Sequence, residues 1–195
     1  MEADERFVEE WLREKSLRVE RFSKQERRRS KTPEFRVLRG EVLAFFCEVK
    51  SMREDERLDN ALAAAPPGSI VEVCGPDSTF NAVENKIHEA VRQFDAVNPE
   101  LEYPNVLVVV NHDRARDVGD LCAVVEGDFV AEDGTRHAIY REFSEGRIRY
   151  EKLRIAVYVW IERRAGDAFV RWYDCVRDRY PVLAEVFPVA REKIA

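Results

Sequence analysis

The sequence contains neither a Cys-x-x-Cys pair nor two histidines at metal-ligand spacing. Its four cysteines are scattered singly along the chain: Cys47, Cys74, Cys122 and Cys175. Its three histidines are equally dispersed: His88, His112 and His137. A zinc site or a dithiol redox motif is therefore not expected. We expect the cysteines to be reduced core residues, because most of them stand among apolar neighbours.

Long apolar runs are also missing. No stretch approaches the ~20 residues that a membrane-spanning helix needs, and the opening Met-Glu-Ala-Asp-Glu-Arg is too charged for a secretory leader. We therefore expect a soluble, cytoplasmic protein. The sequence shows no internal repeat, low-complexity tract or interdomain linker, so we expect one domain over residues 1–195, with a core over about 1–127 and a C-terminal elaboration over 128–195.

One basic segment stands out against a net charge of −6. Between residues 13 and 31, nine basic residues accompany three acidic ones. The basic residues are Arg13, Lys15, Arg18, Arg21, Lys24, Arg27, Arg28, Arg29 and Lys31. The segment is either a solvated charged surface or a stripe that contacts nucleic-acid phosphates, and composition alone leaves both open.

Helical and strand-like hydrophobic patterns alternate along the chain, which predicts an α/β fold with a mixed sheet flanked by helices. Helices are predicted over residues 4–15, 58–65, 78–98 and 117–126. Strands are predicted over residues 17–22, 34–38, 42–50, 70–74, 106–110 and 155–161. The apolar run 106–110 is typical of a strand covered on both faces.

The C-terminal third gives a less regular pattern. Between residues 129 and 154, Asp133-Gly134 and Glu145-Gly146 predict turns between polar strands. Residues 168–186 are predicted to form two short helices separated by Pro181. The side chains expected to pack inward are Phe169, Trp172, Tyr173, Val176 and Tyr180.

The pattern Glu-x-Lys occurs twice, at Glu48–Lys50 and at Glu84–Lys86. Residues two apart point the same way in a strand but not on a helix, so only the first pair can face one site. Glu34, at the start of the preceding strand, offers a second carboxylate. Two carboxylates across a hairpin suit a magnesium-like ion, and a nearby lysine can orient water or stabilise phosphate charge. Phosphodiester hydrolysis is the matching reaction, and a cross-strand ion pair on a solvated face is the alternative.

The metal hypothesis sets a condition on the hairpin register. A tight two-residue turn at Arg39-Gly40 would place Glu34 opposite Phe45. Only a longer loop or a β-bulge places Glu34 opposite Glu48.

Two short motifs resemble those of the PD-(D/E)XK nuclease superfamily, which has the restriction-endonuclease-like fold. They are Pro33-Glu34-Phe35 and Phe46-Cys47-Glu48-Val49-Lys50-Ser51. Residues 5–15 are similar to the first helix of archaeal Holliday-junction resolvases, in which a glutamate completes the site, here Glu5. Residues 86–94 are similar to the helix after the catalytic strands, which can supply a site-facing glutamine, here Gln93.

The resemblance covers roughly the first 110 residues and implies an αβββαβ core, followed here by a C-terminal strand and helices. It implies a magnesium- or manganese-dependent nuclease acting on DNA rather than RNA, with Glu34 and Glu48 as metal ligands and Lys50 as the catalytic cation. Glu5 and Gln93 complete the implied catalytic set, and a homodimer is one arrangement that such nucleases use. Glu34 replaces the usual aspartate, and Val97 stands where a fuller motif has tyrosine.

Two other functions stay open on the sequence. The chain could be a non-catalytic module that keeps the nuclease fold and binds nucleic acid or a protein partner, or it could self-associate through Trp172 and Tyr173. Aromatic and basic residues interleave between positions 140 and 154, which is as typical of an exposed hairpin as of a nucleic-acid surface. Glu5 could equally serve the helix dipole, and Gln93 could be a polar boundary residue.

Overall fold

The computed structural model describes residues 3–53, 60–61, 63–70, 78–114, 116–130, 135–138, 148, 150–164, 167–174, 179–188 and 192–194. The helices are α1 (Ala3–Glu14), α2 (Lys24–Arg29), α4 (Ser78–Asp95), α5 (Val118–Glu126), α7 (Pro181–Val186) and the 3-10 helix η1 (Glu151–Arg154). The strands are β1 (Arg18–Arg21), β2 (Phe35–Arg39), β3 (Val42–Met52), β4 (Asn105–Asn111), β5 (Asp128–Val130), β6 (Arg136–Ala138), β7 (Val157–Arg164), β8 (Asp167–Asp174) and β9 (Glu192–Ile194).

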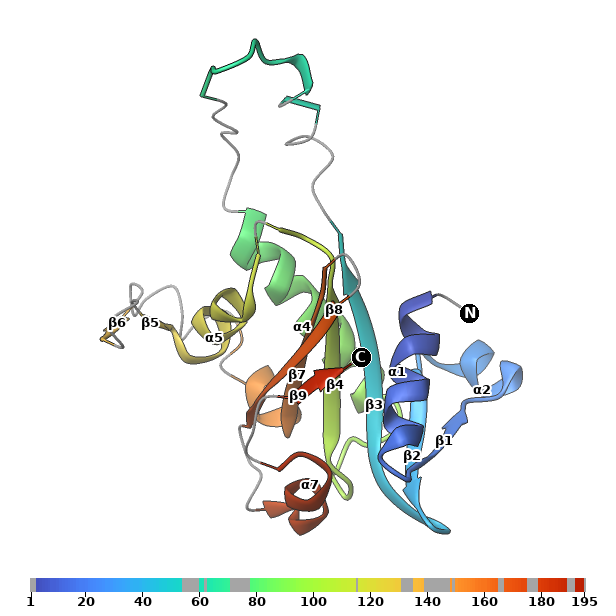
Figure 1. Ribbon diagram of the computed structural model, residues 1–195. Helices are drawn as coiled ribbons and strands as arrows, with labels where there is room; N and C mark the ends of the chain where they lie inside the picture. Colours follow the sequence, from blue (N-terminus) through green and yellow to red (C-terminus); the bar gives the residue numbers. More distant parts are fainter. Residues whose placement is uncertain are drawn as a thin grey trace.

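Seven of these strands form one mixed sheet in the order β1-β2-β3-β4-β7-β8-β9 (Figure 1). Strand β2 pairs antiparallel with both β1 and β3. Strand β4 pairs parallel with both β3 and β7. The predicted α/β class with a mixed, helix-flanked sheet is confirmed. The element order over the first part of the chain is α1, β1, β2, β3, α4, β4, with the short helix α2 inserted after β1.

Two hydrophobic cores hold the sheet between helices. On one face, α1 and α7 pack through side chains such as Trp11 and Leu183. On the other, α4 and α5 pack through side chains such as Ile87 and Leu121. All seven residues of β4 are buried, and successive residues contribute to opposite cores, as predicted for a strand covered on both faces. Strands β7, β8 and β9 continue this same sheet.

The β2–β3 hairpin turns tightly at Gly40 and Glu41, because Arg39 pairs directly with Val42. Gly40 has a φ of 61°, in the left-handed region that glycine adopts without steric cost. Without any further irregularity, this turn would leave Glu34 opposite Cys47.

A β-bulge corrects that register by one residue. Val37 pairs with Phe45, but the next pair toward the turn skips Ala44, which is the extra residue of the bulge. Continuing the register beyond the first residue of β2 places Glu34 opposite Glu48. The structure therefore meets the condition that the metal hypothesis imposed on the hairpin.

The prediction of a helix over the first part of residues 168–186 is wrong. Residues 167–174 form strand β8, which pairs with β7 along its whole length, and only Pro181–Val186 is helical. The aromatic residues of this segment recur at helical spacing, but aromatic and β-branched residues also favour strands, and pairing with β7 decides the outcome. Tyr180 packs against the core as predicted, and Val176 lies outside the described residues.

Several other predictions fall partly or wholly outside the described residues. Residues 60–61 and 63–64 are helical, as predicted for the segment 58–65, but Leu58 and Leu62 are not described. The predicted strand 70–74, the two predicted turns after residue 130 and most of the aromatic and basic series 140–154 are likewise not described. Cys47 and Cys122 are thiols; Cys47 is buried in the core as predicted, Cys122 is only half-buried, and Cys74 and Cys175 lie outside the described residues. No helix in the described part of the chain combines the length and apolarity needed to cross a membrane.

Candidate active site

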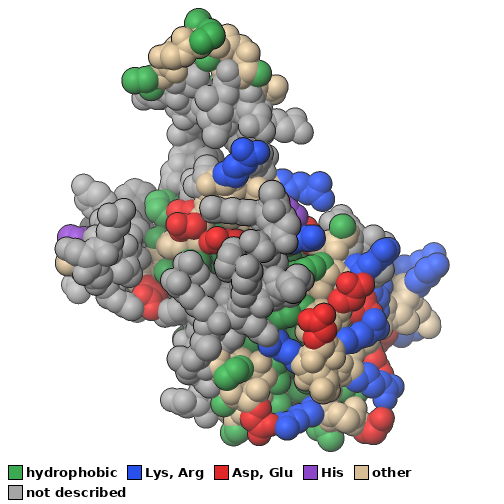
Figure 2. Space-filling model, in the orientation of Figure 1, with side chains coloured by type: hydrophobic (Ala, Val, Ile, Leu, Met, Phe, Trp, Pro, Cys, Tyr) green, Lys and Arg blue, Asp and Glu red, His purple; other side chains and the backbone are tan. Residues whose placement is uncertain are grey.

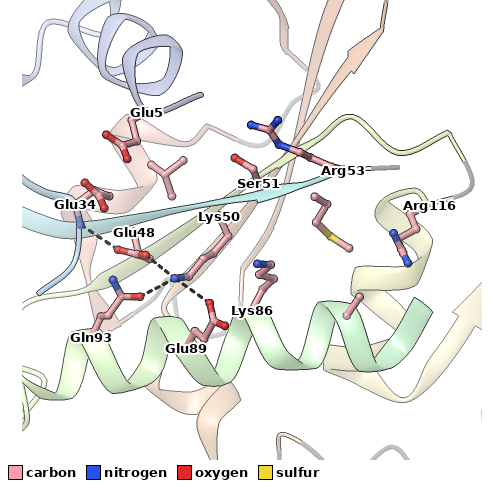
Figure 3. Close-up of a pocket in the computed structure, with 13 residues that line it drawn as sticks. Glu5, Glu34, Glu48, Lys50, Ser51, Arg53, Lys86, Glu89, Gln93 and Arg116 are labelled. Carbon is pink, nitrogen blue, oxygen red and sulfur yellow. Dashed lines mark hydrogen bonds and ion pairs between the residues drawn. The ribbon is translucent and has the colours of Figure 1, made fainter. Parts of the chain in front are cut away.

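A pocket of about 790 Å³ lies beside the carboxyl-terminal half of β3, between the start of α1 and the face of α4 (Figure 3). All five residues predicted for the site line it: Glu5, Glu34, Glu48, Lys50 and Gln93. They come from α1, from the residue before β2, from β3 and from α4. The fold thus gathers residues that are up to 88 positions apart in the sequence.

Glu34 and Glu48 are joined across the hairpin. The backbone N–H of Glu34 donates a hydrogen bond to Glu48 Oε2 at 3.0 Å. The side chain of Glu34 leans toward the α1 side of the pocket, whereas Glu48 faces α4 (Figure 3). Both residues nevertheless line the same pocket.

Lys50 is fixed from both β3 and α4. Its Nζ lies 2.9 Å from Glu48 Oε1 and donates to Gln93 Oε1 at 2.8 Å, and Glu89 Oε2 lies 3.3 Å away. Gln93 is itself anchored, since its Nε2 donates to the carbonyl of Thr32 at 3.1 Å. Only 13% of the Lys50 side chain is exposed, so its ammonium group has little freedom to leave this position.

Burial sets the ionisation of the two carboxylates. Glu48 is 1% exposed, and burial raises its pKa to about 7, although Lys50 opposes the rise and Glu34 adds to it. Burial also raises the pKa of Glu34, and the nearby Glu5 raises it further, while Arg27, Arg21 and Lys50 act in the opposite direction. A nearby cation would therefore favour the charged form of each group.

Glu5 reaches the pocket but is already engaged by a cation. Arg21 Nη1 donates to Glu5 Oε2 at 2.8 Å, and the same guanidinium group contacts Glu9 Oε2 at 3.1 Å. Arg21 Nη1 also lies 3.6 Å from Glu34 Oε2. That oxygen is buried and accepts no hydrogen bond. Arg21 thus holds Glu5 close to Glu34, and one oxygen of Glu34 keeps an unused lone pair.

The backbone of β3 is open on the side of the pocket. Residues 48–52 pair with β4, but in the described structure β2 pairs only with residues 42–47. Backbone groups of successive strand residues point alternately to the two sides. Phe46 and Met52 bond toward β4 and its flanking loops, so Val49 and Ser51 direct their N–H and C=O groups to the unpaired edge.

The residues present fit a magnesium-like ion. Such an ion keeps several waters and needs only one or two protein carboxylates, which Glu34 and Glu48 provide. The unused oxygen of Glu34 and the outward backbone carbonyl of Val49 are further oxygen donors at this edge. Within the described residues no group of three or more His, Cys, Asp and Glu side chains is placed to hold a metal ion.

Several lining residues were not predicted: Ser51, Arg53, Lys86, Glu89 and Arg116. Three of them had a detectable pattern. Lys86 and Glu89 share a helical face with Gln93 at spacings of seven and four residues, and Ser51 belongs to the strand motif. Arg116 follows β4 in an irregular segment, where sequence periodicity carries no information.

A second polar cluster anchors α1 beside the pocket. Asp4 is buried and accepts a hydrogen bond from Ser51 Oγ at 2.6 Å. It also contacts His112 Nε2 at 2.9 Å and lies 3.6 Å from Arg163 Nη1. These contacts tie the first turn of α1, which carries Glu5, to strands β3 and β7 and to the residue after β4.

The basic segment is only partly free for phosphates. Arg13, Arg18 and Arg21 form ion pairs with glutamates. Figure 2 shows basic and acidic side chains intermixed on the side of the molecule that carries α1, α2 and β1. The exposed cations of this segment that form no ion pair with any described residue lie on or just after α2, which a Ser23–Glu26 capping box begins.

Comparisons with protein-family models, with curated proteins and with solved structures found no match to this chain.

Proposed function

We propose that the protein is a magnesium- or manganese-dependent nuclease that hydrolyses phosphodiester bonds, of DNA in preference to RNA, in the pocket beside β3. One observation carries the proposal. The hairpin bulge brings Glu34 opposite Glu48 while Lys50, two residues further along β3, faces the same pocket and is fixed by Gln93.

Glu34 and Glu48 would hold the divalent cation, which would supply Lewis-acid stabilisation of charge on the phosphate. Glu48 suits this role because its carboxylate is buried and has a pKa of about 7. A carboxyl group in this state gains more from a nearby cation than a solvated one does, since water no longer stabilises its charge.

Lys50 would stabilise charge on the phosphate or orient the attacking water. Its ammonium group is already placed by Glu48 and Gln93, so little side-chain ordering is needed when substrate arrives. Gln93 acts as a positioning residue for Lys50. Glu5 is held beside Glu34 by Arg21 and completes the acidic end of the pocket.

Cleavage assays with matched variants test the proposal. Single-stranded, duplex and branched DNA and the corresponding RNA would be incubated with Mg²⁺ or Mn²⁺ and the parent protein, Lys50→Ala or Glu48→Gln. We expect both variants to lose at least about 100-fold in rate. Glu41→Gln is the control, because Glu41 lies in the exposed turn of the same hairpin. Equal cleavage by all four proteins would point to a contaminant and remove the proposal.

Binding measurements separate this function from a non-catalytic module. Titration calorimetry with Mn²⁺ should show one site that Glu34→Gln and Glu48→Gln weaken. A parent protein that binds nucleic acid but neither binds Mn²⁺ nor cleaves would support the non-catalytic alternative. Light scattering of the same samples would show whether the protein is a homodimer.

A further inference from the structure

We propose that Lys86 binds a second phosphate of the same polynucleotide, a few nucleotides from the bond positioned at Lys50, with Arg53 on the opposite lip of the pocket. This inference rests on the proposed function and adds a minimum length of the substrate. It makes the pocket a two-ended site, acidic at Glu34 and basic at Lys86.

The charge pairing inside the pocket separates the two ends. Lys50 is neutralised by Glu48 and Glu89, and Arg21 serves Glu5 and Glu34. The other two exposed or half-buried cations of the lining, Lys86 and Arg53, have no hydrogen bond or ion pair to any residue that the structure describes.

Lys86 lacks a partner because the one acidic residue three or four positions away along α4 is already engaged. Glu89 lies three residues further along α4, where it could pair with Lys86, but its carboxylate is 3.3 Å from Lys50. Figure 3 shows Lys86 rising from α4 into the pocket, on the side of Lys50 away from Gln93.

Arg116 gives a second, independent indication of an anion at this end. Its side chain is only 10% exposed and lines the pocket beyond Lys86 (Figure 3). Although Arg116 pairs with Asp113, its Nε is buried without a hydrogen-bond partner. Asp113 compensates the charge of Arg116, so the local positive potential that a phosphate requires comes from Lys86 and Arg53, and Arg116 contributes an unused hydrogen-bond donor.

The helix sets the distance between the two phosphates. Lys86 precedes Gln93, which holds Lys50, by seven residues, or roughly 10 Å along α4 at about 1.5 Å per residue. A stacked strand rises about 3.4 Å per nucleotide. The second phosphate should therefore lie within roughly three nucleotides of the cleaved bond, and substrates too short to reach Lys86 should bind more weakly.

A phosphate-neutralisation scan tests this assignment. A set of fluorescent single-stranded DNA oligonucleotides would each carry one uncharged methylphosphonate at a different position. Their affinities for the parent, Lys86→Gln and Arg92→Gln would be measured by anisotropy in metal-free buffer. Arg92 is the matched control, because it is an exposed cation on the same helix that does not line the pocket.

We expect Lys86→Gln to weaken binding by about tenfold and to reduce the slope of log affinity against log salt by about one. A methylphosphonate at one position should weaken DNA binding by the parent and by Arg92→Gln. The same oligonucleotide should bind Lys86→Gln as tightly as unmodified DNA does. Parent-like affinity of Lys86→Gln, or equal sensitivity of all three proteins at every phosphate, would overturn the assignment. Cleavage with Mg²⁺ is measured in a separate assay, and its absence would remove the proposed function. If the phosphate to which Lys86→Gln is insensitive lies far from the cleaved bond, only the distance between the two phosphates is wrong.

Discussion

The buried carboxyl of Glu48 should make the stability of the metal-free protein fall as the pH rises toward neutrality. Burial raises the pKa of Glu48 from 4.5 to about 7. The folded protein therefore holds this proton over a range in which the unfolded chain has released it. Because the native state binds more protons, the free energy of unfolding decreases with increasing pH over this range.

The size of the effect follows from the two pKa values. A rise from 4.5 to about 7 corresponds to about 3 kcal/mol, at about 1.4 kcal/mol for each tenfold change in proton affinity. This stabilisation is complete below pH 4.5 and is lost as the pH passes through 7. Glu48 is 1% exposed, so solvent screening removes little of it.

Urea denaturation of the parent and Glu48→Gln from pH 5 to 8 would isolate the contribution of this group. Other carboxyl groups titrate in both proteins, but only the parent carries the proton at position 48. The difference in unfolding free energy, parent minus variant, should therefore fall by about 3 kcal/mol as the pH rises. Parallel curves for the two proteins would refute the argument that Glu48 is desolvated. Saturating Mg²⁺ should flatten the parent's curve, since a bound cation favours the charged carboxylate.

Two further variants probe the groups that place α1. Arg21→Gln should lower the free energy of unfolding by about 2–3 kcal/mol at pH 7, because Glu5, Glu9 and Glu34 lose their shared cation. The loss should be smaller at pH 4, because burial raises the pKa of Glu34 and so favours its uncharged form there. Urea denaturation at both pH values checks this, and an effect independent of pH would contradict it. Asp4→Ala should lower the free energy of unfolding by about 1–3 kcal/mol, because Ser51 and His112 lose their buried acceptor. Thermal denaturation of this variant is compared with that of Glu10→Ala, which changes an exposed residue of the same helix. Equal stability of the two variants would count against a structural role for Asp4.

The parts of the fold that the sequence predicts well are those in which local pattern and tertiary packing agree. The apolar residues of α4, from Val83 to Phe94, have helical spacing and are buried as a stripe. The apolar run of β4 is buried along its whole length, as expected of a central strand. Helix α5 is defined at both ends, by the Asp117 cap and by Gly127 at a φ of 77°. The helix predicted over the residues of β8 is wrong because the spacing of the aromatic residues also fits a helix. The segment is a strand because it pairs with β7, and that pairing cannot be read from the local sequence.

The candidate site was predictable to the extent that it lies on regular elements. Glu48 and Lys50 could be grouped because strand residues two apart share a face, and the structure places them in one pocket. The ties that set their chemistry were not predictable. The Gln93–Lys50 contact and the Arg21 bridge between Glu5 and Glu34 join residues from separate elements, so they depend on the packed arrangement of α1 and α4 around the sheet.

The bulge at Ala44 shows why such a site needs the structure. The turn alone would pair Glu34 with Cys47, whose side chain belongs to the core on the α1 side. One extra residue shifts the partner to Glu48 and so moves the facing side chain to the α4 side, since adjacent strand residues point to opposite faces. Nothing in the local sequence around Ala44 distinguishes a bulge from regular pairing. Burial on the α1 side favours it, because the shifted register pairs Phe35 with Cys47 and Val37 with Phe45, and all four side chains belong to that core.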